Sequence, residues 1–313
     1  MMEAKIRKPA VAGSFYAGDA KELRQDVQNC FSRCKNPLME NVQAVIVPHA
    51  GYVFSGVTAA SAFAAINPDA EYEHIFLLGP SHHVYLGKAS VNIGVSAYAT
   101  PLGNVPVDTA LCKDLMEKSD AITYAQEAHE SEHCLEVELP FLQYHMKKLP
   151  SIVPIIIATQ ELTTLKKIAD TLKPYLNEKN LFVISSDFSH YPAYKDAEIV
   201  DGLTKDSIMT GKVEAFVNAT LHNQELGIDH LATSACGMAP IATLLMMTEN
   251  DANIKPHHVM YCNSGDSPYG RKDKVVGYHS FVFTTETCGF DLTSEDRKML
   301  KSIAYHTIKA TLE

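Results

Sequence analysis

The sequence lacks the features that would commit it to a membrane, to export or to nucleic acid. Within its 313 residues, no apolar run approaches the roughly 18 residues that a membrane-spanning helix needs. Its Lys and Arg residues form no cluster and the formal net charge is −10, so it lacks a basic surface for phosphates. Residues 1–16 contain Lys5, Arg7 and Lys8 but no apolar signal-peptide core. We therefore expect a protein that is not exported and binds neither membrane nor nucleic acid.

Disulfide and zinc-finger patterns are also missing. The seven cysteines are scattered and odd in number, which in a chain without a signal sequence is typical of reduced, cytoplasmic thiols. Cys30 and Cys34 have helical spacing, but no second pair of Cys or His residues lies nearby to complete a structural zinc site. We therefore expect a cytoplasmic protein without a zinc finger.

Three familiar motifs are absent as well. Neither GxGxxG nor GxxxxGK[ST] occurs, so Gly79 does not begin a phosphate-binding loop. No GxSxG motif occurs, which disfavours a serine hydrolase.

Short apolar runs alternate with longer amphipathic stretches, a pattern typical of strands alternating with helices. The expected strands are Val42–Val47, His74–Leu78, Ile152–Ile157, Leu181–Ser185, Val259–Cys262 and Val275–Phe283. The expected helices are Ala20–Cys34, Val57–Ile66, Thr109–Lys118, Glu136–Leu149, Leu162–Leu176, Ala197–Thr210 and Met238–Thr248. Pro140 predicts that its helix begins near it or bends there. Gly87–Pro106 is a candidate antiparallel excursion. Several strands are continuously apolar, which indicates a sheet covered on both faces.

Histidine or aspartate side chains follow three of the expected strands. His49 follows the strand that ends at residue 47. His82 and His83 follow the strand that ends at residue 78, and Asp187 and His190 follow the one that ends at residue 185. Ligands of open α/β sheets bind beyond the carboxyl ends of the strands, and neutral imidazole is both a common metal ligand and a general base. A single histidine in such a place is more often a turn residue that bonds the backbone, and His83 fits that role or a supporting one. Three strands with the same arrangement favour a metal or catalytic site.

Two further segments are candidates for the same pocket. His133 precedes the helix expected at Glu136, although a solvated segment leading into a helix explains it equally well. Cys236 lies just before the helix expected at Met238, where the positive end of the helix dipole favours a thiolate, a good soft metal ligand. On sequence alone, a buried and inert cysteine is the simpler interpretation of Cys236.

A series of colinear segments resembles the Memo family, whose microbial members are often called protein B of the AmmeMemoRadiSam system. The resemblance runs from about residue 5 to about 285, with appropriate spacing. Its segments are Arg7–Tyr16, Pro48–Tyr52, Gly79–His83, Glu132–Pro140, Ser185–His190, Ala235–Pro240 and Ser264–Asp266. It implies an α/β fold like that of the LigB-type (class III) extradiol dioxygenases. That fold is a single large domain with a central, mostly parallel sheet flanked by helices, and a pocket at the sheet edge that holds non-haem iron.

The resemblance also implies roles for single residues. The family's metal site of two histidines and one cysteine falls on His49, His82 and Cys236. Its accompanying acid and base fall on Asp187 and His190, which we expect to be catalytic. His83 and His133 remain candidates for supporting or substrate contacts. Iron(II) is the expected cofactor, and copper or zinc also suit such ligands.

The ligand set departs from that of the ring-cleaving dioxygenases, which use two histidines and a carboxylate. Here a thiolate would be the third ligand, with Asp187 as an alternative or extra one, so the shared fold is weak support for the same reaction. The leading hypothesis is a redox enzyme that acts with dioxygen on an unknown small molecule. The alternative is a non-catalytic metal- or peptide-binding protein that uses the same cleft, since animal members of the family are linked to receptor-kinase signalling. A metal-dependent hydrolase fits a redox-sensitive thiolate less well.

The last residues form a separate prediction. We expect a Memo-like metal-binding domain over residues 1–287 and a helical extension over 288–313. In the extension Thr293 or Ser294 is a credible N-cap. This extension resembles the start of an AMMECR-type domain, the usual companion of Memo in microbes, although a plain C-terminal helix is the alternative. AMMECR-type and radical-SAM proteins are therefore the expected partners.

Overall fold

Buried strands and amphipathic helices alternate in the computed structural model, which describes residues 5–34, 37–286, 295, 298–304 and 306. The helices are α1 (Ala20–Ser32), α2 (Tyr52–Phe63), α3 (Thr109–Lys118), α4 (Leu139–His145), α5 (Leu162–Leu172), α6 (Tyr194–Met209), α7 (Val213–Glu225) and α8 (Met238–Thr248). The strands are β1 (Ile6–Arg7), β2 (Val42–Val47), β3 (His74–Pro80), β4 (Lys88–Val91), β5 (Ala97–Thr100), β6 (Gly103–Pro106), β7 (Ile122–Thr123), β8 (Ser151–Ala158), β9 (Asn180–Ser185), β10 (Ile254–Asn263) and β11 (Gly277–Thr285).

The main sheet is mixed and has eight strands in the order β10-β11-β2-β9-β3-β8-β4-β7. At its centre β2, β9, β3 and β8 are parallel to one another, and every residue of β2 and β9 is buried. At the flanks β11 runs antiparallel to β2 and to β10, and β4 runs antiparallel to β8. The expectation of a mostly parallel sheet thus holds for the centre, and the antiparallel flanks make the whole sheet mixed.

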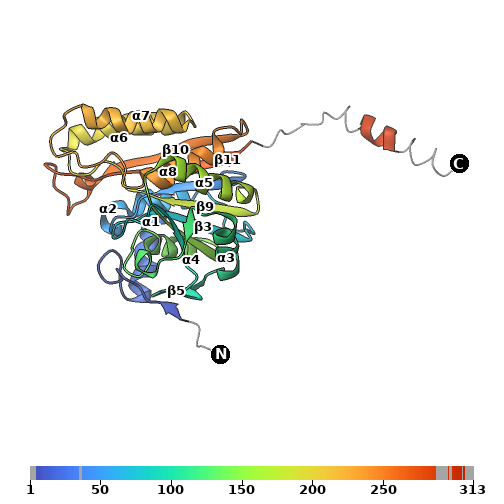
Figure 1. Ribbon diagram of the computed structural model, residues 1–313, viewed down its shortest axis with the longest axis horizontal. Coiled ribbons are helices and arrows are strands. Elements are labelled where there is room, and N and C mark those ends of the chain that lie inside the picture. Colours follow the sequence, from blue (N-terminus) through green and yellow to red (C-terminus); the bar gives the residue numbers. More distant parts are fainter. Residues whose placement is uncertain (1–4, 35–36, 287–294, 296–297, 305, 307–313) are drawn as a thin grey trace.

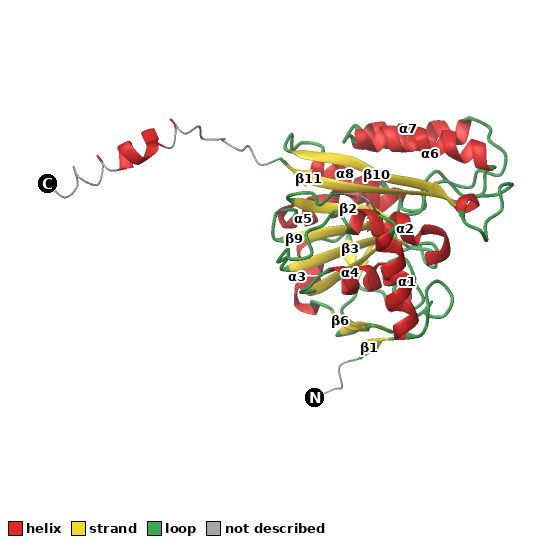
Figure 2. Ribbon diagram, turned by 180° about the vertical axis from the view of Figure 1, so that it is seen from behind, coloured by secondary structure: helices red, strands yellow, loops and turns green. Residues whose placement is uncertain are grey.

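Helices cover both faces of this sheet. On one face α2 packs on β2, β10 and β11 and is joined by α1 and α4; on the other, α8 packs on β3 and β9 beside α5. Helix α6 lies against β10 and β11 and forms a pair with α7, which also contacts α8. Figures 1 and 2 show this pair side by side at one end of the molecule, with the small sheet β1-β5-β6 at the opposite end.

Local sequence explains where these helices form. In α1 the side chain of Asp19 caps the first turn by accepting from two backbone N–H groups, and Leu23, Val27 and Cys30 form the buried face. In α8 every residue from 239 to 248 is buried, because this helix is apolar all round and lies between the sheet and its neighbours.

All the strands and helices predicted above are present: Val42–Val47, Thr109–Lys118 and Met238–Thr248 have the predicted bounds, and the others have shifted ends. The helix predicted at 57–66 begins earlier, at Tyr52, and the one predicted at 136–149 is a 3₁₀ turn followed by α4, with Pro140 in the first turn. The helix predicted at 162–176 ends at Leu172, before Pro174. The excursion at 87–106 contains β4, β5 and β6. Helix α7 was not predicted, because its apolar residues form no clear stripe along one face and it buries only Phe216 and Asn223.

The predicted extension over 288–313 lies largely outside the described residues, so it stays a prediction. Among the helices that the structure describes, none has the length and apolar character required to cross a bilayer.

Candidate metal site

The three strand ends singled out in the sequence lie side by side. Strands β2, β9 and β3 are neighbours and parallel, so the loops after them meet at one edge of the sheet. His49 follows β2, His82 follows β3, and Asp187 follows β9. Cys236 reaches the same edge from the segment just before α8.

His49 is buried and fixed by hydrogen bonds on both sides of its ring. Its Nδ1 lies 2.8 Å from Ser185 Oγ, and its Nε2 lies 3.2 Å from Cys236 Sγ. Burial lowers the pKa of His49 well below its ordinary value, and the neighbouring His82 acts in the same direction. Because the single hydroxyl proton of Ser185 goes to the Cys134 carbonyl, the neutral ring donates from Nδ1 to Ser185, and its Nε2 then has a free lone pair that can accept the Cys236 thiol proton.

Ser185 connects His49 to a buried acid. The Ser185 hydroxyl donates to the carbonyl of Cys134 at 2.7 Å and lies 3.0 Å from Glu138 Oε1. Burial raises the pKa of Glu138 well above its ordinary value, which favours the neutral carboxyl, and a neutral carboxyl can donate its own proton to Ser185 Oγ. His49 is therefore oriented by a chain of neutral groups.

His82 is oriented by a charged group instead. Its Nδ1 lies 2.9 Å from Glu132 Oε1, and its backbone N–H donates to Glu132 Oε2 at 2.7 Å. Glu132 Oε1 also accepts from the backbone N–H groups of His133 and Cys134. Burial alone would lower the pKa of His82 and raise that of Glu132, but their pairing reverses both shifts. A carboxylate that accepts from one ring nitrogen is the usual support of a metal-binding histidine.

Cys236 corrects one expectation from the sequence. The helix end was expected to lower its pKa, yet burial, together with the nearby carboxyl of Asp187, raises the pKa of the thiol. Desolvation of a thiolate outweighs the helix dipole here. In the metal-free protein Cys236 is therefore a thiol, and it would become a thiolate ligand only if a cation replaced its proton.

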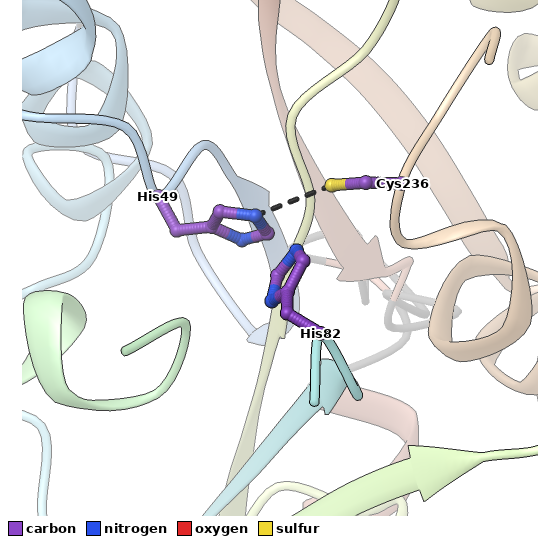
Figure 3. A group of neighbouring side chains, drawn as sticks. All are labelled: His49, His82 and Cys236. Atoms are coloured by element: carbon purple, nitrogen blue, oxygen red, sulfur yellow. Dashed lines mark hydrogen bonds between the residues drawn. The ribbon is translucent and has the colours of Figure 1, made fainter. Parts of the chain in front are cut away.

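The candidate ligand atoms of His49, His82 and Cys236 all lie within 4.8 Å of one another. Figure 3 shows the two imidazole rings and the thiol directed toward one another from three separate segments. The ring centroids of the two histidines are 5.1 Å apart. His82 is the most accessible, with 29% of its side chain exposed. The structure thus brings together the three ligands expected from the resemblance.

Asp187 and His190 lie on the loop after β9. Asp187 is buried, its Oδ1 accepts from the backbone N–H of His49 at 2.8 Å, and its Oδ2 lies 4.0 Å from His49 Nε2. Burial raises the pKa of Asp187, and the charge of His190 acts in the opposite direction. His190 Nδ1 lies 2.8 Å from the Phe188 carbonyl and donates to it. The next residue, Tyr191, has a φ of 74°, a left-handed conformation that bulky residues rarely adopt.

His83 and His133 lie near the candidate ligands. His133 is 4.7 Å from His82 and 5.4 Å from His49, measured between ring centroids. Burial lowers the pKa of His133 to about 4, so its ring is neutral. His83 is exposed and lines a cavity of about 700 Å³ that opens beside His82 and Cys236.

Sequence reasoning did not identify the groups that support the ligands, namely Glu132, Ser185 and Glu138. Ser185 was seen only as a strand end. Glu132 stands next to His133, but nothing in the local sequence separates it from the other acid of the segment, Glu130. Its burial and its bonds to His82 depend on tertiary structure.

Comparison with known proteins extends these observations. A sequence model of the Memo-like protein family matches residues 7–282. A MEMO1 family protein of Nitrosopumilus maritimus is 32% identical, over 89% of this chain and 99% of its own length. A MEMO1 family protein of Aeropyrum pernix is 35% identical, over 88% of this chain and 98% of its own length.

The fold also has a counterpart among solved structures. An uncharacterized protein of Escherichia coli K12 superposes with a TM-score of 0.52 and 14% identity, covering 77% of this chain and 99% of its own. At that identity the likeness concerns the fold alone.

Proposed function

The chain belongs to the Memo-like family, and from that premise we propose that it is a metal-dependent redox enzyme. In this proposal His49, His82 and Cys236 bind iron(II), and the substrate is a small organic molecule that reacts with dioxygen. The observation that carries it is the convergence of two imidazoles and one thiol, with all ligand atoms within 4.8 Å. Two nitrogens and a thiolate suit iron, and copper or zinc are the alternatives.

The residues fit a metal ion in two respects. The Cys236 thiol and His49 Nε2 share one proton at 3.2 Å, so a cation that displaces this proton would be held by both. In addition, His49 and His82 each use Nδ1 on a fixed acceptor, which leaves Nε2 as the ligand atom of each ring.

A bound metal would supply a Lewis acid and a redox centre for dioxygen and substrate. The chain's own residues supply orientation and proton transfer. Ser185 and Glu132 hold the two imidazoles in place. Because Nδ1 of His190 is engaged with the Phe188 carbonyl, its Nε2 is the atom that would accept or give a proton. Asp187 would stabilise the charged form of His190.

The cavity supports a small molecule as the substrate. Its volume of about 700 Å³ is within the range of small-molecule sites, roughly 300–1,000 Å³. Its lining includes His82 and Cys236, together with His83 and the largely exposed Tyr85. An aromatic substrate could contact these two rings with its face or edge.

Anaerobic purification followed by metal analysis and a dioxygen-uptake screen with catechol-like compounds tests this function. We expect about one iron per chain and substrate-dependent uptake. A protein that retains iron tightly but consumes no dioxygen would instead favour a role in binding or sequestering metal. The His49→Ala variant is the matched control, since it should lose both iron and uptake.

We also propose a cytoplasmic location and AMMECR-type and radical-SAM proteins as partners, on the strength of the family resemblance. Co-purification of the tagged chain with such proteins from the source cells tests the partnership. Absence of both from the eluate would count against it.

A further inference from the structure

We propose that Arg7 is a positioning residue of the candidate metal site, which holds the loop that presents Glu132 to His82. The inference rests on the proposed function, since it concerns the support of one proposed ligand. Residues 7–16 form a prominent motif of the sequence, yet none of them is a candidate ligand.

Arg7 is buried at the end of β1, and its guanidinium bonds to several points of one loop. Its Nε donates to the His129 carbonyl at 2.7 Å, its Nη2 donates to the Glu132 carbonyl, and its Nη1 donates to Glu136 Oε2 at 2.6 Å. The Tyr98 ring lies 4.8 Å from the guanidinium carbon, which fixes the plane of the group. Arg7 therefore fixes the main chain on both sides of the Glu132 side chain.

Glu136 binds the rest of the N-terminal segment, residues 7–16, to the same loop. Its carboxylate accepts from Tyr16 Oη at 2.6 Å and from the backbone N–H groups of Ala10 at 2.7 Å and Val11 at 3.0 Å, besides Arg7. A buried ion pair stabilises a fold only when such additional hydrogen bonds satisfy its charges. Here they do, so the segment and the loop form one rigid unit.

Phe15 connects this unit to the loop after β2, which carries His49. Its ring centroid lies 4.8 Å from that of His133, and its carbonyl accepts from the backbone N–H of Tyr52 at 2.8 Å. Tyr52 begins α2, three residues after His49. The segment thus touches the loop that supports His82 and the loop that carries His49.

The position of Glu132 matters because its carboxylate accepts four hydrogen bonds, two of them from His82. A shift of the main chain at 132 would move this carboxylate away from the His82 ring and free the ring to rotate. Arginine suits the role because its planar fork makes several directed bonds at once, which the single ammonium of lysine cannot do. Arg7→Lys should therefore keep the charge beside Glu136 but release the carbonyl of Glu132.

The test compares Arg7→Lys with Lys8→Met, an exposed neighbour on the same segment. In the metal-free protein, proton NMR would follow the downfield signal of the His82 Nδ1–H that is bonded to Glu132, assigned by its loss in Glu132→Gln. We expect this signal in the wild type and in Lys8→Met, and its loss or rapid exchange in Arg7→Lys. Anaerobic titration should show iron(II) affinity weakened roughly tenfold or more in Arg7→Lys, as for other partners outside the coordination shell.

A folded Arg7→Lys protein with an unchanged His82 signal and unchanged iron affinity would overturn the inference and leave Arg7 a purely structural residue. If the wild type binds no iron but the His82 signal is still lost in Arg7→Lys, the proposed function fails and the positioning role stands. Should Arg7→Lys not fold, the double variant Arg7→Met/Glu136→Gln removes both buried charges together and gives the same two readings.

Discussion

Asp201 should make the stability of this protein fall as the pH rises toward neutrality. Its carboxyl on α6 is fully buried and has neutral partners: the backbone N–H and the hydroxyl of Ser189 and the hydroxyl of Tyr261, each at 2.9 Å. Burial raises the pKa of Asp201 to about 7, from an ordinary value of 3.8, although these hydrogen bonds act to lower it. The charged form is therefore the costly one.

The sign and size of the effect follow from the two pKa values. Between about pH 4 and pH 7 the folded protein keeps a proton at Asp201 that the unfolded chain has released. The contribution of Asp201 to the free energy of unfolding is thus fully present below the unfolded pKa and is lost as the pH rises through the folded one. The slope is about 1.4 kcal/mol per pH unit, with an upper limit of about 4 kcal/mol in total.

Urea unfolding of the wild type and of Asp201→Asn, at several pH values from about 5 to 7, measures this contribution. Asparagine imitates the neutral carboxyl and does not titrate. Between about pH 5 and pH 7 the free energy of unfolding of the variant should therefore rise by about 2–3 kcal/mol relative to that of the wild type, independently of any constant difference between the two proteins. Asp206→Asn, an exposed carboxylate on the same helix, is the matched control. Parallel stability curves for the wild type and Asp201→Asn would refute the reasoning, because they would mean that Asp201 is ionised throughout.

Three further predictions concern the site and its surroundings. His49→Ala should lose iron and activity together, whereas His190→Ala should keep iron and lose roughly 10²–10⁴-fold in turnover. Parallel metal titrations and rate measurements test this contrast, and equal loss of metal in both variants would make His190 a ligand. Cys236→Ser should weaken metal binding without changing the circular dichroism spectrum, and an unchanged affinity would point to a different third ligand. Gly277→Ala should cost about 1–3 kcal/mol in urea unfolding, because a Cβ there would lie 1.9 Å from Asp201 Oδ2. A variant as stable as the wild type would show that this carboxyl is free to move.

The convergence of the candidate ligands was predictable from the sequence because it depends on a periodic feature. Buried strands are continuous apolar runs, and their ends are marked by the polar residues that follow, such as His49, His82 and Asp187. In a parallel arrangement such ends share one edge, whatever the order of the strands. The actual order, β2-β9-β3, makes the three loops direct neighbours.

The supporting groups could not be predicted in the same way, because their roles arise from contacts between distant segments. Glu132 meets His82 across 50 positions of sequence, and Arg7 meets Glu132 across 125. For a related reason the sequence could not decide between the two interpretations of Cys236, a thiolate favoured by the helix dipole and a buried thiol. The sequence places the thiol before α8 but contains no measure of its burial, and burial is the larger effect.

The distance along the chain between the proposed ligands has a consequence for the protein's lifetime. His49 and Cys236 are separated by 187 positions, so an ion held by both would tie remote parts of the chain together as a reversible cross-link. Such an ion would bind the folded chain far better than the unfolded one. At a free metal concentration a hundred times the dissociation constant, it would add about 2.7 kcal/mol to the free energy of unfolding. Metal-starved cells would then hold a larger unfolded fraction for proteases to remove, so that abundance itself would report on metal supply.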